Sequence, residues 1–259
     1  MSKPIEITKL FKEVTQNPKF KKYFLIGGLI HFLICITSFT DIAYALYLTK
    51  ITLNIKYEII SGVIGLISLI LTFWFLGFWI NTIEENCKKE TNEQFEIASF
   101  TIGKNMLSGF IFNIAIYLPA FLLSLVCMLI GILSFIAITL GIIIFYQAGT
   151  APGTPLPFIC GFLAIAITFI VSILAIILMV VLYPQIVSNY INTGIVATCN
   201  LKQIFLQIKN NFLTSFKVST MTIILGILSM IPFFGFYFEL VWAKMFAEYA
   251  KLNKNEIAN

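Results

Sequence analysis

Between Asn105 and Leu201, the chain carries 97 consecutive residues without one Asp, Glu, Lys, Arg or His. A water-soluble domain shows charged side chains far more often, whereas a helix that crosses a membrane needs about 20 consecutive apolar residues. The whole chain follows the same trend, since 59% of its residues are hydrophobic and 11% are charged. Soluble domains contain about 25% charged residues. The sequence therefore predicts an all-α, polytopic transmembrane helical bundle.

Six apolar runs are long enough to cross a bilayer as helices. They cover residues 23–40, 59–80, a segment within 106–146, 158–183, 213–231 and 232–250. We expect a single six-span membrane domain over residues 23–250, after a cytoplasmic amphipathic segment (1–22) and before a short cytoplasmic tail (251–259). The residues Ala43-Tyr44-Ala45 resemble a signal-peptidase site, but we expect the first span to stay uncleaved because the topology needs it.

Residues 105–146 are long enough for one span or for two, and the distribution of lysine decides between them. All seventeen basic residues are lysines. One span there, with a cytoplasmic N-terminus, leaves 15 lysines inside and only Lys50 and Lys56 outside, whereas two spans leave 9 inside and 8 outside. Cytoplasmic loops of membrane proteins carry an excess of Lys. We therefore predict one span there, and both termini in the cytoplasm.

Three segments before the expected hairpins show a helical stripe pattern. The apolar stripes are Ile7, Leu10, Phe11 and Val14 in the first segment and Leu201, Ile204, Phe205, Ile208 and Phe212 in the third. The second segment has a polar stripe of Thr101, Lys104, Asn105 and Ser108. We expect these segments to lie in the headgroup plane as amphipathic helices. The pattern indicates three helix-hairpin units, or simply basic linkers before each hairpin.

Lysines beside these stripes are expected to face anionic headgroups at the cytoplasmic surface of the bilayer. They are Lys9, Lys12, Lys104, Lys202 and Lys209. A nucleic-acid partner is not expected, because the lysines are scattered rather than gathered on an aromatic-bearing domain. Protein partners do not follow from the sequence.

Three blocks of the chain carry a family pattern of small and aromatic residues. They are LGFWINTIEENCKKETNEQFEIASFTIGKNMLSGFIFNIAIYLP (76–119), YPQIVSNYINTGIVATCNLKQIFLQIKNNFLTSF (183–216) and IPFFGFYFELVWAKMFAEYAKL (231–252). Together they make about residues 15–252 resemble the domain-of-unknown-function 4013 family of prokaryotic integral membrane proteins. The chain departs from the family in the acidic linker 84–96 and in a longer first loop.

The resemblance implies a helical bundle in a prokaryotic cytoplasmic membrane, and it implies no activity. The residues themselves also argue against an enzyme, since the chain has a single histidine and no metal-binding, hydrolase or nucleotide-binding motif. The five cysteines contain no C-x-x-C pair. We expect no catalytic residue, no cofactor and no metal site.

Glu239 is the one acidic residue expected near the middle of the bilayer. It lies twelve residues before Lys251, about 18 Å deeper if Lys251 marks the cytoplasmic boundary. An ionised carboxylate at that depth costs at least ~2–3 kcal/mol, so it needs a partner, a proton or a wet cavity. Ala243, Ala247 and Ala250 share its helix face and predict that it points into the bundle. Lys244 is expected to extend toward the surface.

His31, the only histidine, also lies on a face of small residues, about 12 Å from the start of the first span. A hydrogen bond or one bridging water between His31 and Glu239 is therefore our hypothesis. The alternative is a histidine bonded to a carbonyl and a separate, protonated glutamate.

Two further polar or small-residue patterns have structural and functional interpretations. Small residues at i, i+4 spacing, namely Ser61 with Gly65 and Cys160 with Ala164 and Thr168, predict close helix packing. Polar residues at the end of the fourth span predict an interfacial belt, with a polar vestibule as the alternative. They are Gln185, Asn189, Tyr190 and Asn192.

These features favour a non-enzymatic membrane-organising or assembly protein. The alternative function is a small-molecule or ion permease that uses Glu239. A transporter usually carries several ionisable or broken-helix positions near the midplane, and this chain offers one.

Overall fold

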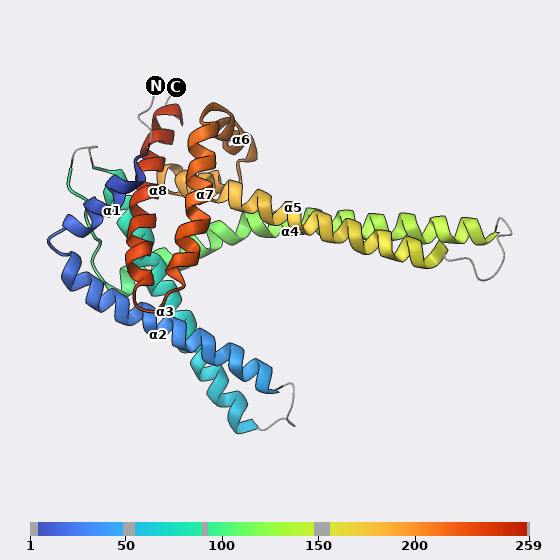
Figure 1. The fold of residues 1–259 in the computed structure, drawn as a ribbon, viewed down its shortest axis with the longest axis horizontal. Helices are drawn as coiled ribbons and strands as arrows, with labels where there is room; N and C mark the ends of the chain where they lie inside the picture. The colour runs from blue at the N-terminus through green and yellow to red at the C-terminus, as the bar shows by residue number, and fades with distance from the viewer. Residues whose placement is uncertain (1–4, 49–54, 90–92, 148–155, 258–259) are drawn as a thin grey trace. The chain divides into compact units, whose positions relative to one another are not determined.

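The computed structural model describes residues 5–48, 55–89, 93–147 and 156–257. Within these ranges the chain is all-helical, which confirms the predicted fold class (Figure 1). The α-helices are α1 (Ile7–Gln16), α2 (Phe20–Leu48), α3 (Ile55–Cys87), α4 (Ile102–Gln147), α5 (Leu156–Thr193), α6 (Leu201–Asn210), α7 (Phe212–Ser229) and α8 (Gly235–Ile257). A short 3-10 helix, η1 (Ile195–Cys199), precedes α6.

Five of these helices are long and apolar enough to cross a membrane. The candidate spans are Phe20–Thr37, Ile59–Cys87, Ile102–Gly141, Phe169–Thr193 and Phe212–Ser229. These helices are those of a multi-pass membrane protein. The sixth run, expected over residues 232–250, corresponds to α8 and is not among the five. Its charged residues interrupt the apolar sequence: Glu239, Lys244, Glu248 and Lys251.

The chain forms two compact units, one of Met1–Ile116 with Tyr183–Asn259 and one of Tyr117–Leu182. Helices α4 and α5 each contribute to both units. Each also contains a proline within three residues of the unit boundary, Pro119 in α4 and Pro184 in α5. A proline inside a helix removes one backbone hydrogen bond, so both helices are weakened where they pass from one unit to the other.

The second unit is a hairpin of α4 and α5 (Figure 1). Helix α4 is unbroken from Ile102 to Gln147. The structure therefore has one long helix in this segment, not the two shorter helices of the alternative prediction. The α4 part of the hairpin, residues 117–147, is about 46 Å long at 1.5 Å per residue. Its large apolar side chains are exposed, as Phe121 (58%) and Phe135 (66%) illustrate. An exposed apolar surface of this kind is expected where side chains face lipid.

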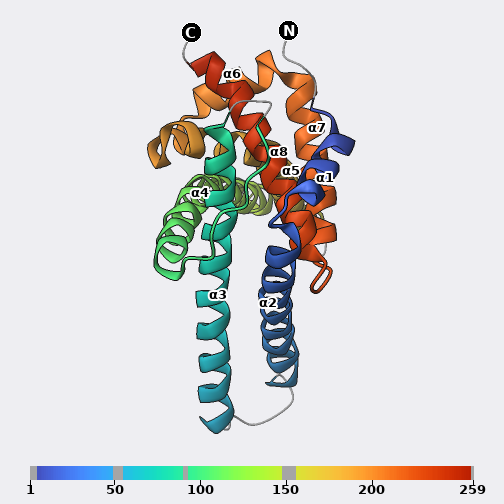
Figure 2. The same ribbon diagram turned by 90° about the vertical axis from the view of Figure 1, so that its left-hand side faces the viewer.

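Helix α8 lies at the centre of the first unit, in contact with α1, α2, α3 and α7 (Figures 1 and 2). The alanine face expected to pack closely is fully buried at Ala243, Ala247 and Ala250. The remaining buried residues of α8 are mostly large and apolar, among them Phe236, Leu240, Phe246 and Tyr249. Because α8 is enclosed by protein, its side chains need partners within the protein rather than in lipid.

Helices α3 and α4 cross in direct backbone contact within the first unit. A Cβ atom added at Gly77 would overlap the carbonyl of Asn105, and one added at Gly109 would overlap the carbonyl of Phe73. Only glycine fits both positions. By contrast, no atom of the described residues lies within 4 Å of a Cβ added at Gly65, so the predicted close packing is not observed there. The pattern of Cys160, Ala164 and Thr168 lies outside the described side chains.

The segment between α3 and α4 is held along α3 by buried polar side chains. Asn86 donates to the Glu96 carbonyl at 2.6 Å, and its Oδ1 accepts from the Glu96 amide at 2.9 Å. The Thr82 hydroxyl accepts from the Ala98 amide at 3.3 Å, and Asn17 donates to the Phe95 carbonyl. These bonds join α1, α3 and the linker into one layer over α8.

The polar stripe at the start of α4 has a different role from the one predicted. Asn105 is buried, accepts a 2.8 Å hydrogen bond from Asn81 and donates to the Ser99 carbonyl at 3.0 Å. Ser108 donates to the Asn81 Oδ1 at 3.2 Å. This half of the stripe joins α4 to α3 instead of facing headgroups, while Thr101 and Lys104 remain exposed.

Candidate functional site

Glu239 lies near the start of α8, where α2 and α7 approach it. The Ser229 side chain on α7 is hydrogen-bonded to the Glu239 carboxyl. The His31 ring on α2 is hydrogen-bonded to the main chain of the same serine. A Cβ atom added at Gly235 would overlap both the His31 ring and the Ser229 carbonyl, so the three helices touch here without spare space.

The structure therefore brings His31 and Glu239 to one residue, Ser229. No ion pair joins the two side chains within the part of the chain that is described. The histidine is bonded to a carbonyl, as in the alternative to the pairing hypothesis. Whether one water links the two side chains stays a prediction.

The Ser229 hydroxyl lies between two acceptors. Its Oγ donates to the Gly226 carbonyl at 2.8 Å and also lies against the Glu239 carboxyl. A hydroxyl has one proton. The Ser229 hydroxyl is thus shared between a main-chain carbonyl and the Glu239 carboxyl.

Two aromatic side chains complete the surroundings of Glu239. The Trp79 Nε1 on α3 donates to the Glu239 carbonyl at 3.0 Å. Tyr183 on α5 lies against Trp242 of α8, with the ring centroids 6.2 Å apart. The site holds an acid, a hydroxyl and an imidazole, which are groups that can pass a proton.

The side chain of Lys244 was expected to extend to the surface, but the structure shows it buried. It is 3% exposed, and its Nζ lies 3.0 Å from both Glu13 Oε2 and Glu248 Oε1. The Phe95 ring covers the ammonium group at 5.7 Å from the ring centroid. The partner Glu13 is on α1, far away in sequence, and no local pattern around residue 244 points to it.

Further ion pairs extend this cluster at both ends. Lys9 lies 3.7 Å from Glu13 on α1, and Lys251 lies 3.3 Å from Glu248 on α8. Lys244, Glu248 and Lys251 of α8 are thus paired within the protein. The cluster fastens α1 to the central helix.

Two of the polar residues at the end of α5, Gln185 and Asn189, bind neighbouring helices instead of forming an interfacial belt. Gln185 and Asn189 are completely buried. Gln185 donates to the Tyr249 hydroxyl at 3.0 Å, and Gln207 on α6 donates to the Asn189 Oδ1 at 2.8 Å. Asn192 donates to the Ala250 carbonyl at 2.9 Å. These side chains bind α5 to α6 and α8.

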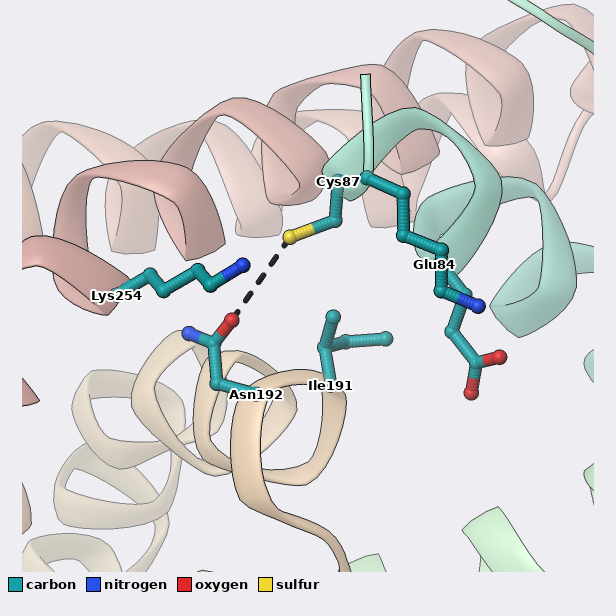
Figure 3. A pocket seen from close by; sticks show the side chains of 6 residues that line it. Glu84, Cys87, Ile191, Asn192 and Lys254 are labelled. Atoms are coloured by element: carbon teal, nitrogen blue, oxygen red, sulfur yellow. Dashed lines mark hydrogen bonds between the residues drawn. The ribbon is translucent and has the colours of Figure 1, made fainter. Parts of the chain in front are cut away.

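A cavity of about 310 Å³ opens where α3, α5 and α8 end (Figure 3). Its lining residues are Glu84, Cys87, Lys88, Ile191, Asn192 and Lys254. The Cys87 thiol donates to the Asn192 Oδ1 at 3.8 Å across one side of the cavity. Sequence reasoning missed this site, because its residues come from three separate segments. The only signal was that polar residues gather where two apolar runs end.

The lysines predicted to face headgroups are all exposed: Lys9, Lys12, Lys104, Lys202 and Lys209. The two short helices beside them differ in their apolar faces. On α1, Leu10 and Val14 are buried in the first unit, so this face packs on protein. On α6, Leu201 (52%) and Phe205 (51%) are exposed, so that face is free to contact lipid.

No group of three or more His, Cys, Asp or Glu side chains is placed to hold a metal ion within the described ranges. Comparisons of the chain with family models, with curated proteins and with solved structures found no match.

Proposed function

We propose that this chain is a non-enzymatic, multi-pass protein of a prokaryotic cytoplasmic membrane that organises or assembles with other membrane components. The observation that carries the proposal is where the polar and the apolar side chains lie. Polar and charged groups inside the first unit bind its helices to one another, whereas the second unit displays apolar side chains outward.

The proposed topology has six spans, with α8 as the sixth and both termini in the cytoplasm. Helices α7 and α8 are in contact and are joined by a turn of only five residues, 230–234. Because α7 is a candidate span, α8 is expected to return beside it. Charged residues are tolerated in a span that faces protein and pairs them there. The lysine distribution supports the same topology.

The hairpin of the second unit is the proposed contact surface. Its α4 part is about 46 Å long, against a hydrocarbon core of about 30 Å. Apolar side chains therefore extend over more length than one bilayer crossing requires. Phe162 on α5, 73% exposed, and Phe135 on α4, 66% exposed, lie on this surface.

Site-specific photo-crosslinking in intact cells tests the proposal. A photoreactive phenylalanine analogue at position 135 or 162 should give a discrete cross-linked protein product. The same analogue in place of the buried Phe78 (1% exposed) serves as the matched control and should give none. Crosslinking to lipid alone at both exposed positions would reject an assembly role for the hairpin.

A second candidate function, an ion-coupled carrier, is favoured by the contact of Glu239 and His31 with Ser229. Vesicles containing the purified chain, loaded with a pH-sensitive dye, distinguish the two functions. The assembly proposal predicts the same proton flux as in protein-free vesicles. A higher flux that Glu239→Gln abolishes would replace it with the carrier.

A further inference from the structure

The cavity at the ends of α3, α5 and α8 lies at the level where two candidate spans stop. The span in α3 ends at Cys87 and the span in α5 ends at Thr193. Cys87, Ile191 and Asn192 line the cavity. An apolar span ends where the hydrocarbon gives way to headgroups. The cavity therefore opens at headgroup level, on the face that the proposed topology assigns to the cytoplasm.

Two of the residues that line the cavity are lysines, Lys88 and Lys254. Neither Lys88 nor Lys254 forms an ion pair with a carboxylate of the described side chains. Two unpaired ammonium groups beside one cavity are suited to a phosphate group.

The lining also includes a carboxylate, Glu84. Glu84 and Lys254 are separated by Ile191 in Figure 3. Glu84 would repel a purely anionic ligand, but it can accept a hydrogen bond from an ammonium group. A ligand that carries both a phosphate and a primary amine matches both kinds of charge in the lining.

The size of the cavity limits what it can hold. A volume of about 310 Å³ is at the low end of the range for small-molecule sites. It accommodates a headgroup, whereas acyl chains have to remain in the adjoining bilayer. The position at the end of two spans allows that arrangement.

We propose that this cavity binds the phosphoethanolamine headgroup of a membrane lipid, with the phosphate at Lys88 and Lys254 and the amine at Glu84. The inference rests on the proposed cytoplasmic placement of these helix ends. It gives the assembly protein a specific lipid partner in addition to its hydrophobic contacts.

Protection of the Cys87 thiol provides the readout, because this side chain lines the cavity. The full chain, with Cys87 and Cys199 as its only cysteines, is placed in nanodiscs of phosphatidylcholine, with or without phosphatidylethanolamine. Phosphatidylcholine has the same phosphate, but its quaternary amine has no proton to donate to Glu84. We expect phosphatidylethanolamine to slow maleimide modification of Cys87 and to leave that of Cys199 unchanged.

Variants assign the effect to individual residues. Removing the charge in Lys88→Gln or Lys254→Gln should weaken protection by about fivefold each. The exposed Lys202 on α6 gives the matched control, since Lys202→Gln leaves the cavity unaltered. Glu84→Gln should remove the preference for phosphatidylethanolamine over phosphatidylcholine. Protection is compared with and without the lipid for each variant, so that a change in intrinsic thiol reactivity cancels.

Several results would overturn the proposal. Equal rates for Cys87 with and without phosphatidylethanolamine would reject the site. Equal protection by phosphatidylglycerol would reject the role of the amine and Glu84. Protection by soluble phosphoethanolamine, but not by the lipid, would assign the cavity to a soluble phosphate ester. Failure of the topology is a separate result, in which Cys87 and Cys199 react from opposite sides of a sealed membrane.

Discussion

The Nζ atom of Lys244 lies 3.0 Å from Oε2 of Glu13, and this ion pair joins the N-terminal helix α1 to the central helix α8. The lysine is 3% exposed and also contacts Glu248. A buried charge of this kind is stable only while its partners stay in place. The N-terminal helix is therefore part of the folded first unit rather than a separate surface segment.

Replacing Lys244 with methionine is expected to destabilise the protein strongly. The change keeps most of the side-chain volume but leaves Glu13 without its buried partner. Loss of one member of a fully buried pair costs about 3–5 kcal/mol, which is an upper bound here because Glu13 is 27% exposed and keeps Lys9 at 3.7 Å. The free energy of unfolding, measured by SDS titration in detergent micelles, should fall by that order. Lys251→Met, which removes a lysine with only one partner at 3.3 Å, is the matched control and should cost less.

Removing both charges tests whether the pair or the lysine alone matters. Glu13→Leu combined with Lys244→Met should recover part of the stability lost in Lys244→Met, because residue 13 then carries no partly buried charge that has lost its nearer partner. If the double variant is as unstable as the sum of the two single variants, the contact between α1 and α8 does not depend on the ion pair.

The sequence predicted the apolar helices well, because the requirement for about 20 apolar residues leaves few alternatives. It also favoured one span within 106–146, and α4 is one unbroken helix. It did not predict the partner of Lys244, since Glu13 is more than two hundred residues away. Residues that meet only through tertiary folding leave no local pattern.

Polar residues near helix ends were misinterpreted for the same reason. Gln185 and Asn189 occur where an interfacial belt is expected, but they are buried against α8 and α6. The same residue types occur at this position whether they hydrogen-bond to a neighbouring helix or to a lipid headgroup. The contact face of the helix decides between them, and it depends on how the helices pack.

Alanine at Gly77 or Gly109 should weaken the crossing of α3 and α4. The added methyl group would meet a backbone carbonyl of the other helix, which cannot move aside like a flexible side chain. We expect a loss of about 1–3 kcal/mol in the free energy of unfolding for each substitution. Gly65→Ala, on α3 with open space around the added atom, is the matched control and should be neutral or slightly stabilising. Equal effects at Gly65 and Gly77 would contradict the direct crossing.

Cysteine labelling tests the topology. In sealed vesicles of known orientation, Cys87 and Cys199 should react with an impermeant maleimide from the cytoplasmic side only, because both follow segments that the lysine distribution places there. Cys160 should be protected or should react from the outside. Labelling of Cys87 and Cys199 from opposite sides would exclude the six-span arrangement.

Acid should weaken the linker that covers α8. The pKa of Glu96 is lowered from its ordinary value, because Lys89 hydrogen-bonds the carboxylate and Lys89 and Lys19 add positive charge. A depressed pKa stabilises the fold above the unfolded value, near 4.3, and this contribution is lost as the pH falls through the folded value. Glu96 is 41% exposed, so the effect is expected to be at most about 1 kcal/mol.

The thermal midpoint in detergent, followed across the acid range, measures this contribution. Lys89→Gln should reduce the loss of stability on acidification, and Lys88→Gln is the control because Lys88 forms no ion pair with a described carboxylate. An identical acid response in wild type and Lys89→Gln would show that the pair makes no difference.

The last prediction concerns the meeting of His31 and Glu239 at Ser229. Each side chain is bonded to a different group of this serine, so removal of one should shift the serine and weaken the bond of the other. Glu239→Gln and His31→Gln should therefore destabilise non-additively in a double-mutant cycle, with a coupling energy of about 0.5 kcal/mol or more. The same cycle in a Ser229→Ala background should show less coupling, because the hydroxyl that bonds Glu239 to this serine is gone while the carbonyl bonded by His31 remains. Glu239→Gln with Lys251→Gln provides an uncoupled reference pair on α8. Additive losses for His31 and Glu239 would show that the two residues contact the same serine but are not energetically coupled.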